Sequence, residues 1–274
     1  MIELGKFNTL SVCRIDGGVF VDGGELGEIP LQDVGQSQYQ LGETLAVFVF
    51  IDGRHQALAY QQTPKAQVSE VAWLQVTSVG RAGAFLDWGL PKDLLVPFNE
   101  QDERMQEGEF YLVYLFLDES NRMVASAHLN DFLLEQAFYF KAGQAVDLLI
   151  ADSTDLGVKA VVNHKYWGLL YKNEIFQTLA KGQRLSGFVK TLREDHKLDL
   201  CLSQDKYPSK IDDASDKVLS ALQKHGGFLA LTDHSDPEII YDTFGVSKKV
   251  FKQAIGGLYK QRKIVIADDG IRLP

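Results

Sequence analysis

An internal repeat constrains this 274-residue chain more than any other feature of its sequence. The pattern consists of an apolar strand, a glycine turn, a second strand, a second turn and a short apolar strand, and it occurs three times. The clearest copy reads WLQVTSVGRAGAFLDWGLPKDLLVPFNE from Trp73 to Glu100 and continues as MQEGEFYLVYLFLDESNRMVASAHL. Short strands joined by glycine corners predict a small β-barrel for each copy.

The strands of the second copy are predicted at 71–79, 83–88, 93–97, 109–117 and 122–127. The first copy places Gly18 and Phe20 where the second has Gly83 and Phe85, and its central loop is two residues shorter. The third copy has Lys159 at the phenylalanine position. We therefore predict three barrels, over 1–66, 67–141 and 142–211. Apolar residues near helical spacing predict a linker helix at the end of the second, over 130–141.

The tail at 212–274 changes from a period of two to the period of a helix. Ser235, followed by Asp-Pro-Glu, predicts a helix start of the capping-box type, and Gly245 predicts the end of that helix. Ser247 predicts the start of the next helix, and the sequence IVIADDGIRL predicts a closing hairpin. Three helices and then a hairpin predict a winged helix-turn-helix domain.

The sequence G-A-F-L-D-x-G, followed by L-L-V-P-x-x-E and then E-G-E, resembles the RNA-binding repeat named after ribosomal protein S1. That repeat is a five-stranded OB-fold barrel. Three such repeats followed by a winged helix resemble the conserved virulence factor B family of bacterial RNA-binding regulators. The resemblance implies a mostly β fold with a C-terminal α/β module, in which three tandem five-stranded OB-fold barrels precede a winged helix-turn-helix domain.

Charge is unevenly distributed along a chain whose net charge is −9. Residues 1–70 hold 4 basic and 9 acidic side chains, 71–143 hold 5 and 11, 144–211 hold 10 and 8, and 212–274 hold 9 and 9. The net charges are therefore −5, −6, +2 and 0. Each RNA phosphate requires a nearby Lys or Arg, so the phosphate-binding surface is predicted in the second half. The first two barrels are expected to bind RNA weakly or to orient the others.

Aromatic side chains on the strands are candidates for stacking on bases, because an OB barrel presents one sheet face to a nucleic-acid strand. The family pattern implies this role for Phe20, Phe85 and Phe98, and Trp88 is a further candidate. The alternative for each of them is a place in the core, which is usual for a strand phenylalanine.

The third copy is the preferred RNA site, because aromatic and cationic residues are interleaved in it. Its candidates are Lys159, His164, Lys165, Tyr166, Trp167, Tyr171 and Lys172. Arg193 and Lys197 flank the next hairpin turn, where they are candidates for phosphate binding. The alternative is a solvated loop.

The helix that follows Ser247 is locally basic, with six cations and no acid over 246–263. Its candidates for contact with a groove or with phosphates are Lys248, Lys249, Lys252, Lys260, Arg262 and Lys263. Winged helices also pair with proteins, and a lysine-rich face can serve solubility alone.

The sequence carries no signature of catalysis or of metal binding. Its six histidines have no metal-ligand spacing, and it has no P-loop, GxSxG motif or dinucleotide fingerprint with a matching βαβ unit. A helix-cap turn explains the DHSD segment at 233–236 better than a catalytic cluster does. Cys13 and Cys201 lie in apolar strand-like runs, which predicts buried thiols in a reducing cytoplasm. We expect no cofactor, no metal, no enzyme activity and no membrane span.

These observations favour a cytoplasmic, non-catalytic single-strand RNA-binding protein that regulates gene expression after transcription or at translation. A second hypothesis is an adaptor whose acidic barrels bind ribosomal or transcription proteins. A third is a DNA-binding transcription regulator that acts through the winged helix.

Overall fold

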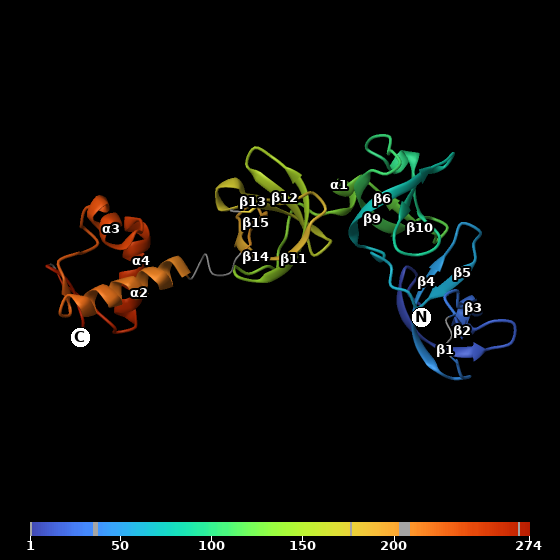
Figure 1. Ribbon diagram of the computed structural model, residues 1–274, viewed down its shortest axis with the longest axis horizontal. Helices are drawn as coiled ribbons and strands as arrows, with labels where there is room; N and C mark the ends of the chain where they lie inside the picture. Colours follow the sequence, from blue (N-terminus) through green and yellow to red (C-terminus); the bar gives the residue numbers. More distant parts are fainter. Residues whose placement is uncertain (1, 35–37, 176, 203–208, 268) are drawn as a thin grey trace. The chain divides into compact units, whose positions relative to one another are not determined.

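The computed structural model of the chain describes residues 2–34, 38–175, 177–202, 209–267 and 269–274. It divides into two compact units, Met1–Leu200 and Cys201–Pro274. The first unit contains three five-stranded β structures, drawn from blue to yellow-orange in Figure 1, and the second holds longer helices with a small sheet. No helix in the described part of the chain is long and apolar enough to cross a membrane.

The first β structure is a sheet with strand order β3-β2-β1-β4-β5. Its elements are β1 (Lys6–Arg14), β2 (Phe20–Asp22), a 3-10 turn at Gly24–Leu26, β3 (Glu28–Pro30), β4 (Thr44–Ile51) and β5 (Ala57–Tyr60). A parallel bridge between Leu31 and Ala59 joins the two ends of the sheet, so the strands form a barrel. Alternate residues of its strands, such as Val12, Val47 and Val49, fill the interior.

The second β structure is a closed barrel with strand order β10-β8-β7-β6-β9. Its elements are β6 (Val71–Val79), β7 (Gly83–Asp87), β8 (Leu94–Pro97), a 3-10 turn at Phe98–Glu100, β9 (Phe110–Leu117) and β10 (Met123–Ser126). Every strand boundary agrees with the prediction to within one residue.

The third β structure is a closed barrel of the same kind, with strand order β11-β12-β13-β15-β14. Its elements are β11 (Ala145–Ser153), β12 (Gly157–Val162), β13 (Tyr166–Tyr171), a 3-10 turn at Lys172–Glu174, β14 (Arg184–Leu192) and β15 (Leu198–Cys201). The predicted fold of three tandem five-stranded OB-type barrels is confirmed.

The repeated glycine at the start of the second strand has a steric cause in the second and third barrels. A Cβ at Gly83 would lie 2.1 Å from the carbonyl oxygen of Val96, and one at Gly157 would lie 2.0 Å from that of Leu170. Only glycine lets the backbones of the second and third strands approach so closely. The glycine therefore permits the observed pairing, in which Phe85 faces Leu95 in one barrel as Lys159 faces Leu169 in the other.

The barrels of the first unit share apolar cores. Phe48 and Phe50 of the first barrel pack in one cluster with Trp88 of the second. Val71 of the second barrel lies in a smaller cluster with Trp167 of the third. Apolar contacts therefore join the first barrel to the second and the second barrel to the third.

The predicted linker helix at 130–141 is wrong in its length. Only one helical turn forms, α1 (Leu129–Phe132), and Leu133 has an extended backbone. The amide of Leu134 donates to the carbonyl of Lys165 at 2.9 Å, and the amide of Trp167 donates to the carbonyl of Leu134, also at 2.9 Å. Pairing with β13 thus overrides the helical spacing of the apolar residues.

The second unit has the predicted winged-helix order. Its elements are α2 (Ser209–Lys224), β16 (Phe228–Leu229), α3 (Pro237–Phe244), α4 (Lys248–Lys260), β17 (Val265–Ala267) and β18 (Gly270–Arg272). The core contains Val218 of α2, Ile240 of α3 and Phe251 of α4. Its sheet has strand order β16-β18-β17.

The helix ends of the second unit agree with the prediction except at one helix cap. Gly245 ends α3 in the left-handed conformation, and the Ser247 hydroxyl caps α4 by accepting from the Val250 amide. The cap of α3, however, is Asp236, whose carboxylate accepts from the Glu238 amide at 2.8 Å. The Ser235 hydroxyl accepts from the Thr232 amide instead.

Candidate nucleic-acid interface

The third barrel has a groove of about 450 Å³ on the face that OB-folds use for ligands. That face lies on the second and third strands, between the loops that follow the first and the fourth strand. Here it consists of β12, β13, the loop at 154–156 and the turn at 193–197.

Four of the predicted RNA-binding residues line this groove, although they come from three separate segments. They are Lys159 on β12, Trp167 on β13, and Arg193 and Lys197 in the turn between β14 and β15. The amide of Arg193 donates to the carbonyl of Lys197 at 3.0 Å and closes that turn. The barrel thereby brings three cations and one indole to a single groove.

Acidic side chains pair with the cations of the groove. The Lys159 ammonium lies 3.9 Å from the centroid of the Trp167 ring and 3.5 Å from a carboxylate oxygen of Glu135. The Lys197 ammonium lies 3.3 Å from the other oxygen of Glu135, and Arg193 lies 3.5 Å from Asp195. These pairs are partly exposed, so each contributes little to stability.

The groove also holds an acidic residue that sequence reasoning missed. Asp199 lines it, and its Oδ1 atom is buried without a hydrogen-bond partner in the described part of the chain. Most buried polar atoms are hydrogen-bonded, so this oxygen is unusual. Asp199 alternates with Leu198 and Leu200 along β15, a pattern that indicates only an outward-facing strand residue.

The turn between the fourth and fifth strands differs in charge among the three barrels. In the first two, Asp52 and Asp118 start the turn and accept backbone N–H groups, including those of Gln56 and Arg122. In the third, Arg193 starts the turn, and the Asp195 carboxylate accepts the Lys197 amide at 3.3 Å. The capping carboxylate has moved by two positions, which leaves a cation at the edge of the groove.

The residues between β12 and β13 form a tight turn and not a solvated loop. Asn163 and His164 both have positive φ, and the Lys165 amide donates to the Val162 carbonyl at 3.0 Å. These features are typical of a type I′ hairpin turn. Of the predicted residues here, Lys165 is exposed.

His164 connects the second and third barrels. Its Nδ1 accepts the backbone amide of Val71 at 3.0 Å. Burial lowers the pKa of His164, which favours the neutral ring that this bond requires. A neutral, partly buried imidazole that joins two barrels is poorly placed to bind a phosphate, so the prediction for His164 is corrected.

The other aromatic candidates of the third barrel are partly covered. Trp167 is only 7% exposed, and its indole N–H donates to the Asn130 side chain at 3.0 Å. Tyr166 is half-buried against the Phe140 ring, with 5.3 Å between centroids. Trp167 therefore offers little surface on which a base could stack, although the ring supports the Lys159 ammonium in the groove.

Tyr171 and Lys172 lie beyond the residues that line this groove. Tyr171 ends β13, and the Lys190 ammonium lies 5.7 Å from its ring centroid. Lys172 is exposed and lines a different pocket of about 340 Å³, together with Asp152 and Lys181. The structure thus separates Tyr171 and Lys172 from the cations Lys159, Arg193 and Lys197 that line the groove.

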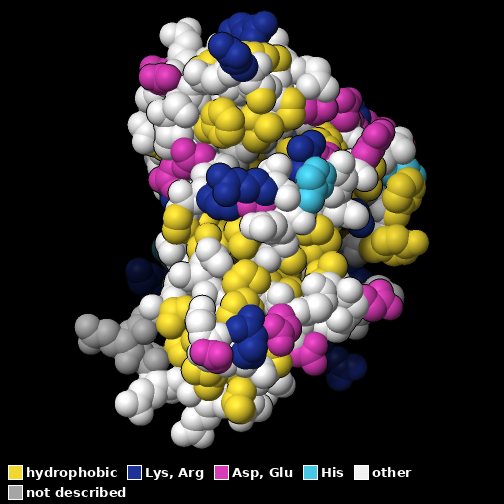
Figure 2. Space-filling model, turned by 90° about the vertical axis from the view of Figure 1, so that its right-hand side faces the viewer, with side chains coloured by type: hydrophobic (Ala, Val, Ile, Leu, Met, Phe, Trp, Pro, Cys, Tyr) yellow, Lys and Arg dark blue, Asp and Glu magenta, His cyan; other side chains and the backbone are white. Residues whose placement is uncertain are grey.

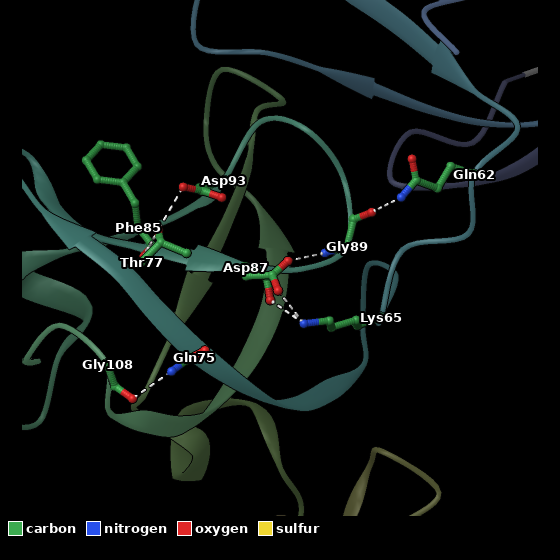
Figure 3. Close-up of polar contacts among 9 residues, drawn as sticks. All are labelled: Gln62, Lys65, Gln75, Thr77, Phe85, Asp87, Gly89, Asp93 and Gly108. Carbon is green, nitrogen blue, oxygen red and sulfur yellow. Dashed lines mark hydrogen bonds and ion pairs between the residues drawn. The ribbon is translucent and has the colours of Figure 1, made fainter. Parts of the chain in front are cut away.

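The equivalent face of the second barrel presents an aromatic side chain among acids (Figure 3). The half-buried Phe85 ring points away from the sheet, and the Thr77 hydroxyl lies 3.0 Å from the Phe85 carbonyl oxygen and 2.7 Å from the Asp93 carboxylate. Asp87 pairs with Lys65 at 2.7 Å. The Lys65 ammonium, together with the Gly89 amide, holds the pKa of Asp87 below its ordinary value.

Phe20 and Phe98 are half-buried beneath arginines. The Arg14 guanidinium lies 3.5 Å from the centroid of Phe20, and that of Arg104 lies 3.8 Å from the centroid of Phe98. Arg14 is itself paired with Glu28 at 2.8 Å. One face of each phenylalanine ring is thus already occupied.

The prediction that Trp88 stacks on RNA is wrong. The side chain is 1% exposed, and it lies edge-on to Phe48 and Phe50, at 5.7 and 5.3 Å between centroids. Its indole N–H donates to the Lys92 carbonyl. The first barrel covers the Trp88 side chain, which no local pattern of the second repeat reveals.

The prediction of buried thiols is also wrong, because Cys13 is exposed.

The first two barrels present mixed charge on the surface in Figure 2. Lys and Arg side chains lie there between Asp and Glu side chains, with hydrophobic groups among them. Residues 1–143 together hold more acidic than basic side chains.

The cations predicted in the winged helix lie on or just after α4. Five of them are exposed, namely Lys249, Lys252, Lys260, Arg262 and Lys263, and Lys248 is partly exposed. The Lys252 ammonium donates to Asp233 at 2.9 Å, a hydrogen bond that lowers the pKa of this carboxyl. The DHSD segment at 233–236 is thus a turn that caps α3, as predicted, and the sequence did not predict its ion pair with α4.

No group of three or more His, Cys, Asp or Glu side chains within the described residues has an arrangement suited to a metal ion.

Comparison with known proteins adds family relationships to this geometry. The S1 domain matches residues 4–60 and 70–128, and the CvfB-like winged helix domain matches residues 216–273. Over nearly the full length, the chain is 25% identical to conserved virulence factor B of Staphylococcus saprophyticus and to that of Staphylococcus aureus USA300. Each match covers 98% of this chain and 94% of the relative.

A solved multidomain protein with nucleic acid binding domains from Streptococcus pneumoniae is also similar. It shares 27% sequence identity over 99% of this chain and 98% of its own, with a TM-score of 0.41.

Tandem S1-type barrels with a ligand-binding face and a winged helix define a class of multidomain nucleic-acid-binding proteins. Within that class, the chain belongs to the conserved virulence factor B family.

Proposed function

We propose that this protein binds single-stranded RNA without catalysing a reaction, and that the groove of the third barrel is its principal site. The observation that carries the proposal is the convergence of Lys159, Arg193 and Lys197 on the OB-fold ligand face. Lys and Arg supply the charge-assisted contacts that follow a phosphate backbone. The first two barrels, which are acidic, orient the third or add weak contacts.

The cellular role that fits this binding is regulation of gene expression after transcription or at translation, in the cytoplasm. Several weak contacts on one RNA strand, in the groove and on the cations of α4, would combine through a raised effective concentration. The exposed Lys249 and Lys260 favour a contribution from the winged helix.

The test is a fluorescence-anisotropy titration with labelled single-stranded RNA, single-stranded DNA and duplex DNA at several salt concentrations. The Arg193→Ala/Lys197→Ala variant should bind single-stranded RNA about tenfold more weakly. The slope of log affinity against log salt should fall by about 0.7 for each lost phosphate contact. A matched control is Lys6→Ala/Lys224→Ala, which removes two cations outside the groove.

Other results would select another function. Preferential binding of duplex DNA, lost on changing Lys248, Lys249 and Lys252, would make α4 the reader of a DNA groove. A protein that binds none of the three nucleic acids would overturn the proposal and favour an adaptor for ribosomal or transcription proteins.

A further inference from the structure

Glu135 occupies the groove of the third barrel, although it belongs to the linker that precedes that barrel. One of its carboxylate oxygens lies 3.5 Å from the Lys159 ammonium, and the other lies 3.3 Å from the Lys197 ammonium. The two lysines come from β12 and from the turn after β14, so one carboxylate bridges two separate parts of the groove.

The backbone on both sides of Glu135 is fixed to the third barrel. Leu134 donates to the carbonyl of Lys165, just before β13, and accepts from the amide of Trp167 on β13. The Ala137 amide donates to the His196 carbonyl at 2.8 Å. The Glu135 side chain itself is 53% exposed. The barrel therefore holds the carboxylate in the groove, but solvent and ligands still reach it.

A carboxylate with one ammonium on each oxygen resembles a phosphate bound by two lysines. Both anions offer two oxygens to the same ammonium groups, so a phosphate and the Glu135 carboxylate compete for Lys159 and Lys197. An RNA phosphate would have to displace Glu135 and would meet its negative charge at short range.

We propose that Glu135 is an intramolecular competitor of RNA phosphate for Lys159 and Lys197. This inference rests on the proposed function of the groove and adds to it a residue that limits affinity. Glu135 weakens the binding of a polyanion that contacts only these two lysines. Such a ligand replaces one anionic partner of the ammonium groups with another and therefore gains little free energy of binding. RNA that also makes contacts outside this pair of lysines displaces the carboxylate more readily.

The test compares Glu135→Gln with wild type in anisotropy titrations with single-stranded RNA. Gln keeps the size of the side chain and one acceptor oxygen, while it removes the charge and replaces the second oxygen with an N–H donor. The variant should bind about two- to fivefold more tightly at low salt, with a steeper dependence on salt. The matched control is Asp152→Asn, which removes the charge of an exposed acid paired with Lys181 and lies outside the residues lining this groove.

A second comparison separates competition from a general change in charge. In a Lys197→Ala background, Glu135→Gln should give a smaller gain in affinity, because one of the two lysines that it releases is gone. Wild type that binds RNA and a Glu135→Gln variant that binds no more tightly than Asp152→Asn would overturn the inference alone. If neither wild type nor Glu135→Gln binds RNA, the proposed function itself is wrong.

Discussion

The second and third barrels have the same strand order of the OB type and the same register, yet they present different side chains at equivalent positions. Phe85 of the second corresponds to Lys159 of the third, since each faces a leucine of the next strand. By the same register Asp93 corresponds to Trp167, and Asp118 corresponds to Arg193. The backbone pairing is thus constant, and the two barrels differ in the side chains at equivalent positions.

The difference extends to the interiors. The second barrel shares a large core with the first, centred on Trp88, whereas the third joins the second through a smaller cluster and the His164 hydrogen bond. The second barrel is therefore suited to a structural role between its neighbours, and the third retains a groove for a ligand.

The largest expected effect concerns the structural role of the second barrel. Trp88→Ala should lower the free energy of unfolding of the first unit by about 3–5 kcal/mol, because it leaves a cavity between the first and second barrels. Thermal and denaturant unfolding measure the loss. A decrease below about 1 kcal/mol would show that the two barrels do not depend on a shared core.

The next effect concerns the turn between the fourth and fifth strands, where the second and third barrels differ in charge. Arg193→Asp gives the third barrel the acid that starts the turn in the second, and it should weaken RNA binding about tenfold or more at low salt. Unfolding should change little, because the residue is exposed. An unchanged affinity for RNA would mean that the charge at this turn does not account for the difference between the two barrels. Glu119→Asp, which keeps the charge of the corresponding turn, is the control on the second barrel.

A smaller effect concerns pH and the joint between the two barrels. The folded state lowers the pKa of His164, so the stability linked to its neutral form is fully present above the unfolded pKa of about 6.5 and decreases as pH falls toward the folded value. Calorimetry should show a larger loss of Tm between pH 7.5 and 5.5 for wild type than for His164→Asn. Equal losses of Tm in the two proteins would show that His164 does not stabilise the contact between the second and third barrels.

The smallest effect is expected on the aromatic face of the second barrel. Phe85→Ala should change RNA affinity by less than about twofold, because the ring lies beside Asp87 and Asp93 on a barrel of net negative charge. A loss of tenfold or more would indicate that Phe85 stacks on a base, which is typically worth 1–3 kcal/mol, and would make both barrels binding sites.

Much of the fold follows from local signals. The strand boundaries of the second repeat, the Gly245 end of α3 and the Ser247 cap of α4 depend on turn chemistry and on periodicity within a few residues. The linker at 130–141 has equally clear helical spacing, but backbone pairing of Leu134 with β13 prevails there. Local patterns therefore predict a helix correctly only where its backbone does not form hydrogen bonds with a strand that is distant in the sequence.

The candidate site was predicted less completely than the fold. Charge and position in the repeat predict Lys159, Arg193 and Lys197, and the barrel brings these three residues to one groove. Trp88 and His164 carried the same kind of signal but serve contacts between barrels. Glu135 carried no signal, because its role depends on how the linker lies against a barrel that follows it.

The sequence by itself determined the three repeats, their order, the winged helix after them and the shift of positive charge into the second half. These features depend on spacing, turn residues and composition, which are properties of short segments. Only the tertiary structure decided which aromatic rings are buried, which cations share a groove and which acid pairs with them. The physical reason is that burial and ion pairing join side chains far apart in the chain, so their outcome depends on barrel closure and on packing between barrels.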